Sequence, residues 1–360
     1  MALTLSDLDP TVAEFCHRLS GQLSARNLHQ LVEDFASLKV LLVGDTIIDR
    51  YAYVRVQGLT SKSRILSARY LNQETQAGGA LAVFRHLKQF TPHVKFLSLV
   101  GTEPWLDEFL GHEVPLEQDL LVRDPSFTTI IKQRFVEPLS RGKELAKLFA
   151  LNFLDAEPPA TALVDKVQRK LEAEIKHYDL IVLADFGHGL LQPALRDFAQ
   201  DNAPFLAVNC QTNSNNHGFN IITRQYRRMD AFSLDAQELM LACGHQHPDF
   251  LEELGALRRQ FGARYAWLTR GPVETIGLGD GEPTSLCPPL EVDVVDTVGA
   301  GDAFFSVASL AAARKLPVEI GTFLGQLAGA QAVRVVGNAQ SISKSVLLRT
   351  GATLLSLTKS

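Results

Sequence analysis

The stretch Val295-Asp296-Thr297-Val298-Gly299-Ala300-Gly301-Asp302-Ala303-Phe304-Phe305 joins a turn of small residues to the start of an apolar helix and places a carboxylate at the junction. Gly299, Ala300 and Gly301 have little or no side chain, so their amides can approach an anion closely. The positive end of the helix dipole lies at the same place. A tight turn followed by an acidic first-turn residue would have the same sequence, so this stretch alone leaves both interpretations open.

The composition is that of an ordinary globular chain with a mild excess of acidic groups. Of the 360 residues, 46% are hydrophobic and 21% are charged, and the formal net charge is −5. No apolar run approaches the roughly 18 residues that suggest a membrane-spanning helix, and no basic footprint indicates a nucleic-acid partner. We therefore expect a small-molecule ligand, no membrane and no nucleic acid. A local cationic pocket for a phosphorylated substrate remains compatible with the acidic total.

The cysteines and the N-terminal segment carry less information. No Cys-x-x-Cys spacing occurs, so neither a disulfide framework nor a zinc ribbon is predicted. The N-terminus has no apolar core or small-residue cleavage site of a secretory signal, and we expect a cytoplasmic protein. Residues 1–38 have apolar side chains near helical spacing, which predicts a helical extension packed on the body or on another subunit.

Short apolar runs that stop at glycine or polar residues alternate with helical stretches along most of the chain. The first run, 39–43, stops at Gly44 and Asp45. This alternation predicts an α/β fold with a mostly parallel central sheet and helices on both faces. Ligands of such sheets bind beyond the carboxyl ends of the strands. Further strands are expected at 94–100, 179–184, 204–208 and 263–268, and helices at 79–90, 160–177, 193–201, 249–261, 301–314 and 318–335.

Extended segments without intervening helices interrupt the alternation. Residues 63–72, 128–136 and 145–153 are rich in β-branched or aromatic side chains. They predict a small antiparallel β flap, or lid, at about 52–75 and 128–154 beside the main sheet. Such a flap could exclude water from a site of phosphoryl transfer. Its strands could also pair with those of a second copy in a homodimer.

Several short motifs occur in the order typical of the ribokinase-like (PfkB) carbohydrate kinases, and the chain resembles that family from about residue 39 to 337. Within the family it looks most like the heptose-7-phosphate kinase branch. The resemblance implies one ribokinase-like domain over 39–337 and a C-terminal tail at 338–360. The specific motif is Asp-Thr-x-Gly-Ala-Gly-Asp at 296–302; the others are Gly44-Asp45 through Asp49-Arg50-Tyr51, Gly78-Gly79-Ala80, Ala184-Asp185-Phe186-Gly187-His188-Gly189 and Thr269-Arg270-Gly271.

The resemblance implies a sugar or sugar-phosphate kinase that uses ATP and Mg²⁺, and it allows a monovalent cation near Asp296. It gives Asp302 the role of general base toward an acceptor hydroxyl. It also makes the amides of Gly299, Ala300 and Gly301 an anion hole for the transferring phosphate.

Acceptor contacts are expected around the exit of the first strand. Asp49 and Asp45 can accept hydrogen bonds from sugar hydroxyls, although either could instead cap a turn or pair with Arg50. Gly78 and Gly79 would let main-chain amides approach the acceptor. The resemblance also places Asp185 and His188 beside the acceptor, and family members commonly have Lys at the position of His188.

A cation on the flap could grip a non-reacting phosphate of the acceptor. Lys62 and Arg134 enter the predicted site for this reason, and Arg64 and Lys132 are alternatives. The heptose kinases have an Arg-Ile-Ser-Pro-Glu-like segment where this chain has Leu-Thr-Ser-Lys-Ser-Arg-Ile at 59–65, which leaves the sugar open.

Nucleotide contacts are expected from Asn209, Thr269, Arg270 and Gly271, with Asn338 at the adenine end. Glu238 would hold Mg²⁺ through water. Asp235 and Glu238 could also form a helix capping box, and one pair of residues can do both.

Three other functions compete with this one. Another PfkB-type kinase could act on a hexose or a nucleoside. A non-catalytic sugar- or nucleotide-binding regulator could retain the fold. The departures of His188, Asp235 and the flap from the family pattern would be compatible with such a protein. A dinucleotide-dependent oxidoreductase would need Gly-x-Gly-x-x-Gly after the first strand, and Gly44-Asp45-Thr46 does not provide it.

Overall fold

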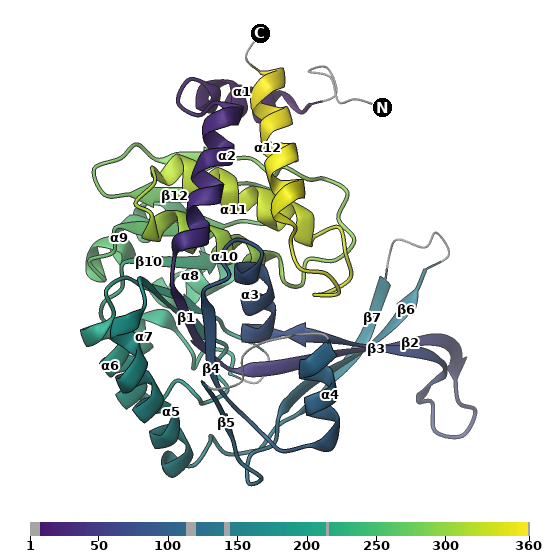
Figure 1. Cartoon of the computed structure of the whole chain (residues 1–360). Helices are drawn as coiled ribbons and strands as arrows, with labels where there is room; N and C mark the ends of the chain where they lie inside the picture. The colour runs from purple at the N-terminus through teal and green to yellow at the C-terminus, as the bar shows by residue number, and fades with distance from the viewer. Residues whose placement is uncertain (1–7, 113–119, 140–144, 214–215, 359–360) are drawn as a thin grey trace.

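The computed structural model describes residues 8–112, 120–139, 145–213 and 216–358, and a nine-stranded sheet lies at its centre (Figure 1). The strand order is β13-β12-β11-β10-β9-β8-β1-β4-β5. From β11 to β5 all neighbours are parallel, and β12 and β13 add antiparallel pairs at one end. This confirms the predicted sheet. Its strands are β1 Val40–Gly44, β4 Val94–Val100, β5 Leu121–Arg123, β8 Leu180–Asp185, β9 Leu206–Cys210, β10 Ala231–Asp235, β11 Tyr265–Thr269, β12 Thr275–Gly279 and β13 Ser285–Cys287.

Helices cover both faces of this sheet, which explains why its strands are apolar along their length. In β1, Val40 and Leu42 belong to one buried cluster, while Leu41 and Val43 belong to the other. None of the described helices is both long and apolar enough to cross a membrane. The helices are α1 Pro10–Ser20, α2 Ala25–Glu33, α3 Gly79–Lys88, α4 Pro104–His112, α5 Thr161–Glu174, α6 Pro193–Asn202, α7 Ile222–Gln225, α8 Ala236–Cys243, α9 Phe250–Gln260, α10 Ala300–Ala313, α11 Val318–Ala332 and α12 Lys344–Leu357.

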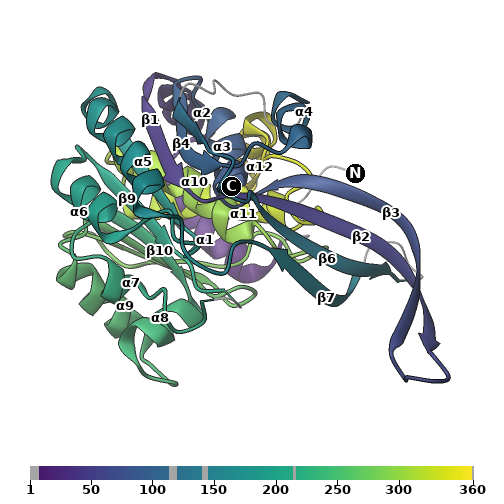
Figure 2. The same ribbon diagram turned by 90° about the horizontal axis from the view of Figure 1, so that it is seen from below.

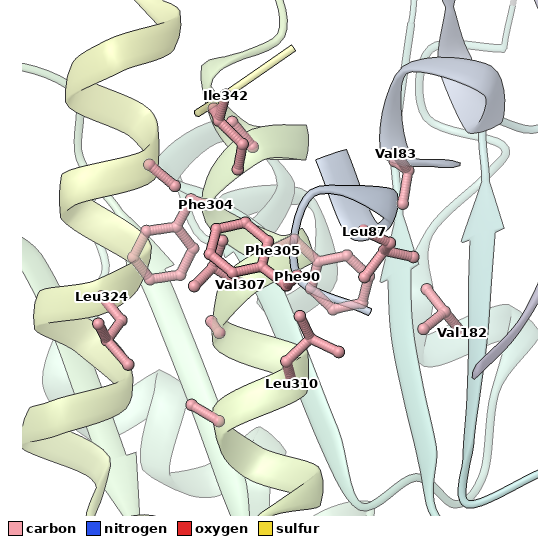
Figure 3. Close-up of a cluster of buried hydrophobic side chains, with 14 of the residues drawn as sticks. Val83, Leu87, Phe90, Val182, Phe304, Phe305, Val307, Leu310, Leu324 and Ile342 are labelled. Carbon is pink, nitrogen blue, oxygen red and sulfur yellow. The ribbon is translucent and has the colours of Figure 1, made fainter. Parts of the chain in front are cut away.

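Helix α10 is deeply buried, and this fixes the turn that precedes it. Its side chains Phe304, Phe305 and Leu310 pack in one cluster with Leu324 of α11 and residues of α3 (Figure 3). Each large side chain buried in this way contributes about 1.5–3 kcal/mol. The start of α10 therefore cannot shift without disturbing the core.

A second sheet projects from the side of the main sheet, and we call it the flap (Figure 2). Its order is β3-β2-β6-β7, with β2 Thr46–Leu59, β3 Leu66–Gly78, β6 Ile130–Pro138 and β7 Leu145–Phe153. The expectation of a fully antiparallel flap was wrong, because β2 and β6 are parallel. Each of them follows the carboxyl end of a parallel strand of the main sheet, β1 or β5. The first hairpin is also longer than the expected 52–75, since β2 begins only two residues after β1 ends.

The terminal segments form helices that pack on one another and on the body. Helices α1 and α2 lie beside α12 in Figure 1. Phe15, Leu28 and Val32 are fully buried in the same cluster as α10. Residues 344–357, which we expected to be a tail, form α12. The terminal helices thus share the core of the main body.

Candidate active site

The small-residue turn leads into α10 at Ala300, with Asp302 in the first turn of the helix. Gly299 has a φ of +83°, a left-handed conformation that favours glycine, and a Cβ there would clash with Asn338. The amide of Ala300 donates to Thr297 O at 3.3 Å. Within the described residues, the amides of Gly301 and Asp302 donate no main-chain hydrogen bond, and the space at the Cβ position of Gly301 is open. The amide of Gly299 likewise donates no main-chain hydrogen bond among these residues, so the amides that can meet an anion are those of Gly299, Gly301 and Asp302, whereas that of Ala300 is engaged.

Asp302 is buried and linked to the carboxyl end of β9. Gln211 Nε2 donates to Asp302 Oδ1 at 2.6 Å and lies equally close to Asn209 Oδ1. Burial raises the pKa of Asp302 to about 7, with the bond from Gln211 opposing the rise and Asp49 adding to it. A carboxyl group of this pKa can exchange a proton at neutral pH, as a general base must.

Asp49 of β2 is held in a buried ion pair with Arg134 of β6. The Arg134 guanidinium also lies over the ring of Tyr51, 5.4 Å from its centroid. Asn338 Nδ2 lies 3.5 Å from the second carboxylate oxygen of Asp49. Gly78 leaves room for this arrangement, because a Cβ there would lie 2.4 Å from Asp49 Oδ2. We predicted that Asn338 contacts the adenine end of the nucleotide. In the structure it lies beside one carboxylate oxygen of Asp49, while Arg134 binds the other.

Asp45 and Asp185 are both engaged by the loop that follows β8. Asp45 accepts hydrogen bonds from the amides of His188 and Leu190 at 3.3 and 3.4 Å. Asp185 accepts from the amide of Gly187 in the same loop at 2.9 Å, and from the hydroxyl of Tyr226, outside the loop, at 2.8 Å. Burial raises the pKa of both carboxyl groups, that of Asp45 to about 7 with a contribution from Asp185. The bonds to the loop amides hold the loop in place, and substrate binding by these two carboxylates stays a prediction.

Gly79 also has a packing role at this edge of the flap. Its φ is +51°, and a Cβ there would lie 2.7 Å from the Ile47 side chain. The glycine therefore allows β3 to turn directly into α3.

Lys132 of β6 is a second flap cation close enough for Asp49, Asp45 and Asp302 to act on its charge. It pairs with Asp49 in the parallel register of β2 and β6. Burial lowers its pKa, while Asp49, Asp45 and Asp302 act in the opposite direction. His188 is neutral, since burial and the charge of Lys132 lower its pKa to about 3. Positive charge at this place therefore comes from Lys132 and not from His188.

Lys62 does not lie with these residues. It is exposed near the tip of the β2–β3 hairpin, beyond Leu59. At about 3.3 Å per residue, the strand from Asp49 to Leu59 spans roughly 30 Å. Because the hairpin is this long, Lys62 and Arg64 at its tip lie far from Asp49 and the other site residues of the same chain.

Except for Asn338, the predicted nucleotide-binding residues lie at or just beyond the carboxyl ends of β9 and β11, which flank β10. Arg270 pairs with Glu274 at 2.5 Å and lies 4.4 Å from the centroid of the Phe250 ring. Gly271 has a φ of +53° in the turn from β11 to β12, and the hydroxyl of Thr269 donates to Leu234 O at 3.4 Å. A separate contact holds Asn209, whose Nδ2 donates to Ser233 O at 3.1 Å.

Asp235 and Glu238 form a complete capping box at the start of α8. Glu238 N donates to Asp235 Oδ1 at 2.8 Å, and Asp235 N donates to Glu238 Oε2 at 2.9 Å. Burial, with repulsion from Asp235, raises the pKa of Glu238 to about 8. The amide of Thr212 donates to Glu238 Oε1 at 3.3 Å, while the buried Thr212 hydroxyl has no hydrogen-bond partner among the residues that the structure describes. An unpartnered hydroxyl beside a carboxylate fits the water shell of Mg²⁺, so these residues fit the metal through water.

Known proteins share this fold and its motifs. The profile of the pfkB family carbohydrate kinases matches residues 37–345 of the chain. The chain belongs to that family. This pfkB kinase is 26% identical over 324 residues to the bifunctional protein HldE of Acidiphilium cryptum, covering 86% of the chain and 62% of that protein. The chain thus spans less than two thirds of the length of this relative.

Two solved structures show the same fold as this pfkB kinase. Phosphofructokinase-2 from Escherichia coli in complex with potassium has a TM-score of 0.66 at 16% identity, covering 88% of this chain and 99% of that one. Arabidopsis thaliana ribokinase complexed with ribose and ATP has a TM-score of 0.64 at 16% identity, covering 87% and 98%. The resemblance to the PfkB kinases is confirmed.

Sequence reasoning missed two contacts of this pfkB kinase. Gln211 was not singled out, although its side chain donates a hydrogen bond to Asp302. Lys147 was not singled out, although its Nζ donates to Asp296 Oδ1 at 2.7 Å. The available signal for Lys147 was a lone cation within the mostly apolar strand 145–153.

Proposed function

We propose that this pfkB kinase transfers the γ-phosphate of ATP to a hydroxyl of a sugar phosphate that resembles heptose 7-phosphate. The observation that carries the proposal is the environment of Asp302. This carboxyl group is buried, its pKa is about 7, and it lies in the first turn of α10 beside amides that lack main-chain partners. Bound ATP with Mg²⁺ supplies the phosphoryl group.

The residues of the chain would position the acceptor and remove its proton. Asp302 accepts the proton of the attacking hydroxyl. The amides of Gly301 and Asp302 donate to the negative charge that develops on the transferring phosphate. Asp49, fixed by Arg134, accepts hydrogen bonds from other hydroxyls of the sugar, which sets its orientation.

Two features support an acceptor that already carries a phosphate. Among the described residues, no ion pair engages Lys132, so its charge is available to an anionic ligand. The HldE relative supports the heptose branch of the family. Arg134 is less available for a phosphate than we expected, because it already pairs with Asp49.

A coupled assay of ADP formation tests the function. Purified protein is offered ATP, Mg²⁺ and a panel of heptose phosphates, hexose phosphates, free sugars and nucleosides. We expect one class of sugar phosphate to stimulate turnover strongly. Tight nucleotide binding without turnover on every acceptor would favour the non-catalytic regulator instead.

The Asp302→Asn variant tests the base. Its kcat should fall by about 10²–10⁴-fold, because a positioned proton acceptor contributes that much, whereas its nucleotide affinity should change little. Asp280→Asn is the matched control, since Asp280 is an exposed carboxylate at the far end of β12. Near-normal turnover by Asp302→Asn would remove Asp302 from this role.

A further inference from the structure

Asp296 is the first residue of the turn of small residues that leads into α10, and we call this turn, residues 296–301, the phosphate turn. Each carboxylate oxygen of Asp296 accepts two hydrogen bonds. Its side chain is 1% exposed. Oδ1 accepts hydrogen bonds from Lys147 Nζ at 2.7 Å and the amide of Val298 at 3.2 Å. Oδ2 accepts from the amide of Gly337 at 3.0 Å and the hydroxyl of Tyr51 at 3.4 Å. Of these four donors, only Lys147 carries a charge.

This arrangement does not suit the free monovalent cation that the family resemblance allows near Asp296. A carboxylate offers about four lone-pair positions, and four donors already occupy those of Asp296. An ion would have to displace one of them. Burial acts to raise the pKa of Asp296, but the bond from Lys147 and those from main-chain amides lower it overall, so the carboxylate is ionised and already neutralised.

Lys147 reaches Asp296 because β7 contains a bulge. Phe149 pairs with Phe135, but Lys147 pairs with Val136, so Leu148 is an extra residue on β7. In regular pairing Lys147 would lie on the same face as Phe149, which is exposed. The bulge turns Lys147 to the inner face of the flap, where Val136 is buried.

We propose that Lys147 is a built-in replacement for a monovalent cation: a positioning residue that neutralises Asp296 and holds the flap against the phosphate turn. This proposal rests on the proposed kinase function. Without the ammonium, Asp296 would be a buried, unpaired charge at the start of the turn that must receive a phosphate. It follows that the wild-type enzyme needs no particular alkali cation, and that removing Lys147 creates such a need.

The experiment compares wild type with Lys147→Met in potassium, ammonium and choline chloride at equal ionic strength. We expect wild type to have the same kcat in all three salts. Lys147→Met should lose roughly tenfold or more of kcat in choline chloride, because the buried carboxylate is unpaired, and should recover part of it in potassium or ammonium. Lys147→Arg, which keeps the charge, should retain most of the activity.

The matched control is Arg55→Met. Arg55 is also a half-exposed flap cation, but its pair with Glu137 is long, at 3.8 Å, and the Glu137 side chain is 17% exposed, whereas that of Asp296 is 1% exposed. This variant should behave like wild type in every salt. A wild-type rate that requires potassium, a wild-type rate for Lys147→Met in choline, or a loss that no cation restores would each overturn the proposal.

A readout without substrate separates this proposal from the proposed function. The melting temperature of Lys147→Met should be higher in potassium chloride than in choline chloride, and that of wild type should be equal in both. If wild type phosphorylates no acceptor, the kinase proposal fails, yet the melting comparison still decides whether a cation replaces Lys147. Equal melting temperatures of Lys147→Met in the two salts would overturn it.

Discussion

At the residue scale, the proposed role of Asp302 as general base predicts the pH dependence of the reaction, because burial raises the pKa of this carboxyl group. A general base must be ionised, and the pKa of Asp302 is about 7. The kcat/KM should therefore fall about tenfold for each pH unit below pH 7 and level off above it. His188 adds no limb in this range, because its pKa is about 3. A pH–rate profile from pH 5.5 to 9, with circular dichroism to verify folding, measures this.

The control for that profile is Asp45, whose pKa is also about 7. Asp45 bonds to the amides of His188 and Leu190 and holds their loop. Asp45→Asn should lower activity through this loop but leave the acidic limb in place. Loss of the limb in Asp45→Asn would assign the titration to Asp45 and contradict the role of Asp302.

At the scale of elements, the sequence predicted the positions of strands and helices that depend on a short stretch of residues. Apolar runs ending at polar residues identified most parallel strands, and the motif at 296–302 identified the start of α10. Pairings between distant segments gave no such signal. The parallel contact of β2 with β6 joins Asp49 to Lys132, and no feature of either strand alone specifies the direction of its partner.

The same limit applies to the site. Asp302 and Asp49 could be predicted as site residues because they belong to short motifs, and their roles stay predictions. The bonds Gln211–Asp302 and Lys147–Asp296 join residues 91 and 149 positions apart, so they depend on the completed fold. The two carboxylates Asp45 and Asp185 resembled ligands of substrate in sequence, and only the structure revealed their loop contacts.

Helix α12 provides a test of whether the terminal helices are part of the core. A Cβ at Gly351 would lie 2.8 Å from Leu28 of α2 and 2.9 Å from Leu327 of α11. Gly351→Val should lower the free energy of unfolding by about 1–3 kcal/mol, because overpacking forces these helices apart. Urea denaturation measures the change, and KM values should stay near wild type.

Gly351→Ala is the control at the same position. Its single methyl group meets the ends of two flexible leucine side chains, and alanine favours the helix by roughly 0.5–1 kcal/mol. The two effects oppose each other, so this variant should unfold close to wild type. Equal stability of Gly351→Val and wild type would show that α2 and α12 are not packed as described.

At the scale of the whole molecule, the flap leaves large apolar side chains uncovered. Leu59 is 66% exposed and Tyr70 is 62% exposed, both on the hairpin that extends beyond the body (Figure 2). Exposed apolar side chains that lie close together often mark an interaction surface. Among the described residues of the flap strands and the segments that join them, the exposed large apolar side chains are Leu59, Ile65, Leu66, Tyr70, Leu71, Leu139, Phe149, Leu151 and Phe153.

We expect a second copy of the chain to cover this surface, since a two-fold pair buries the same face on both partners. Light scattering after size exclusion should give twice the mass of one chain for wild type. The double variant Leu59→Lys/Tyr70→Lys should give a single-chain mass, because it places charges in the buried contact. Val292→Lys is the control, as Val292 is 83% exposed outside the flap and should leave the pair intact. A monomeric wild type at micromolar concentration would contradict this arrangement and leave the apolar face to another partner.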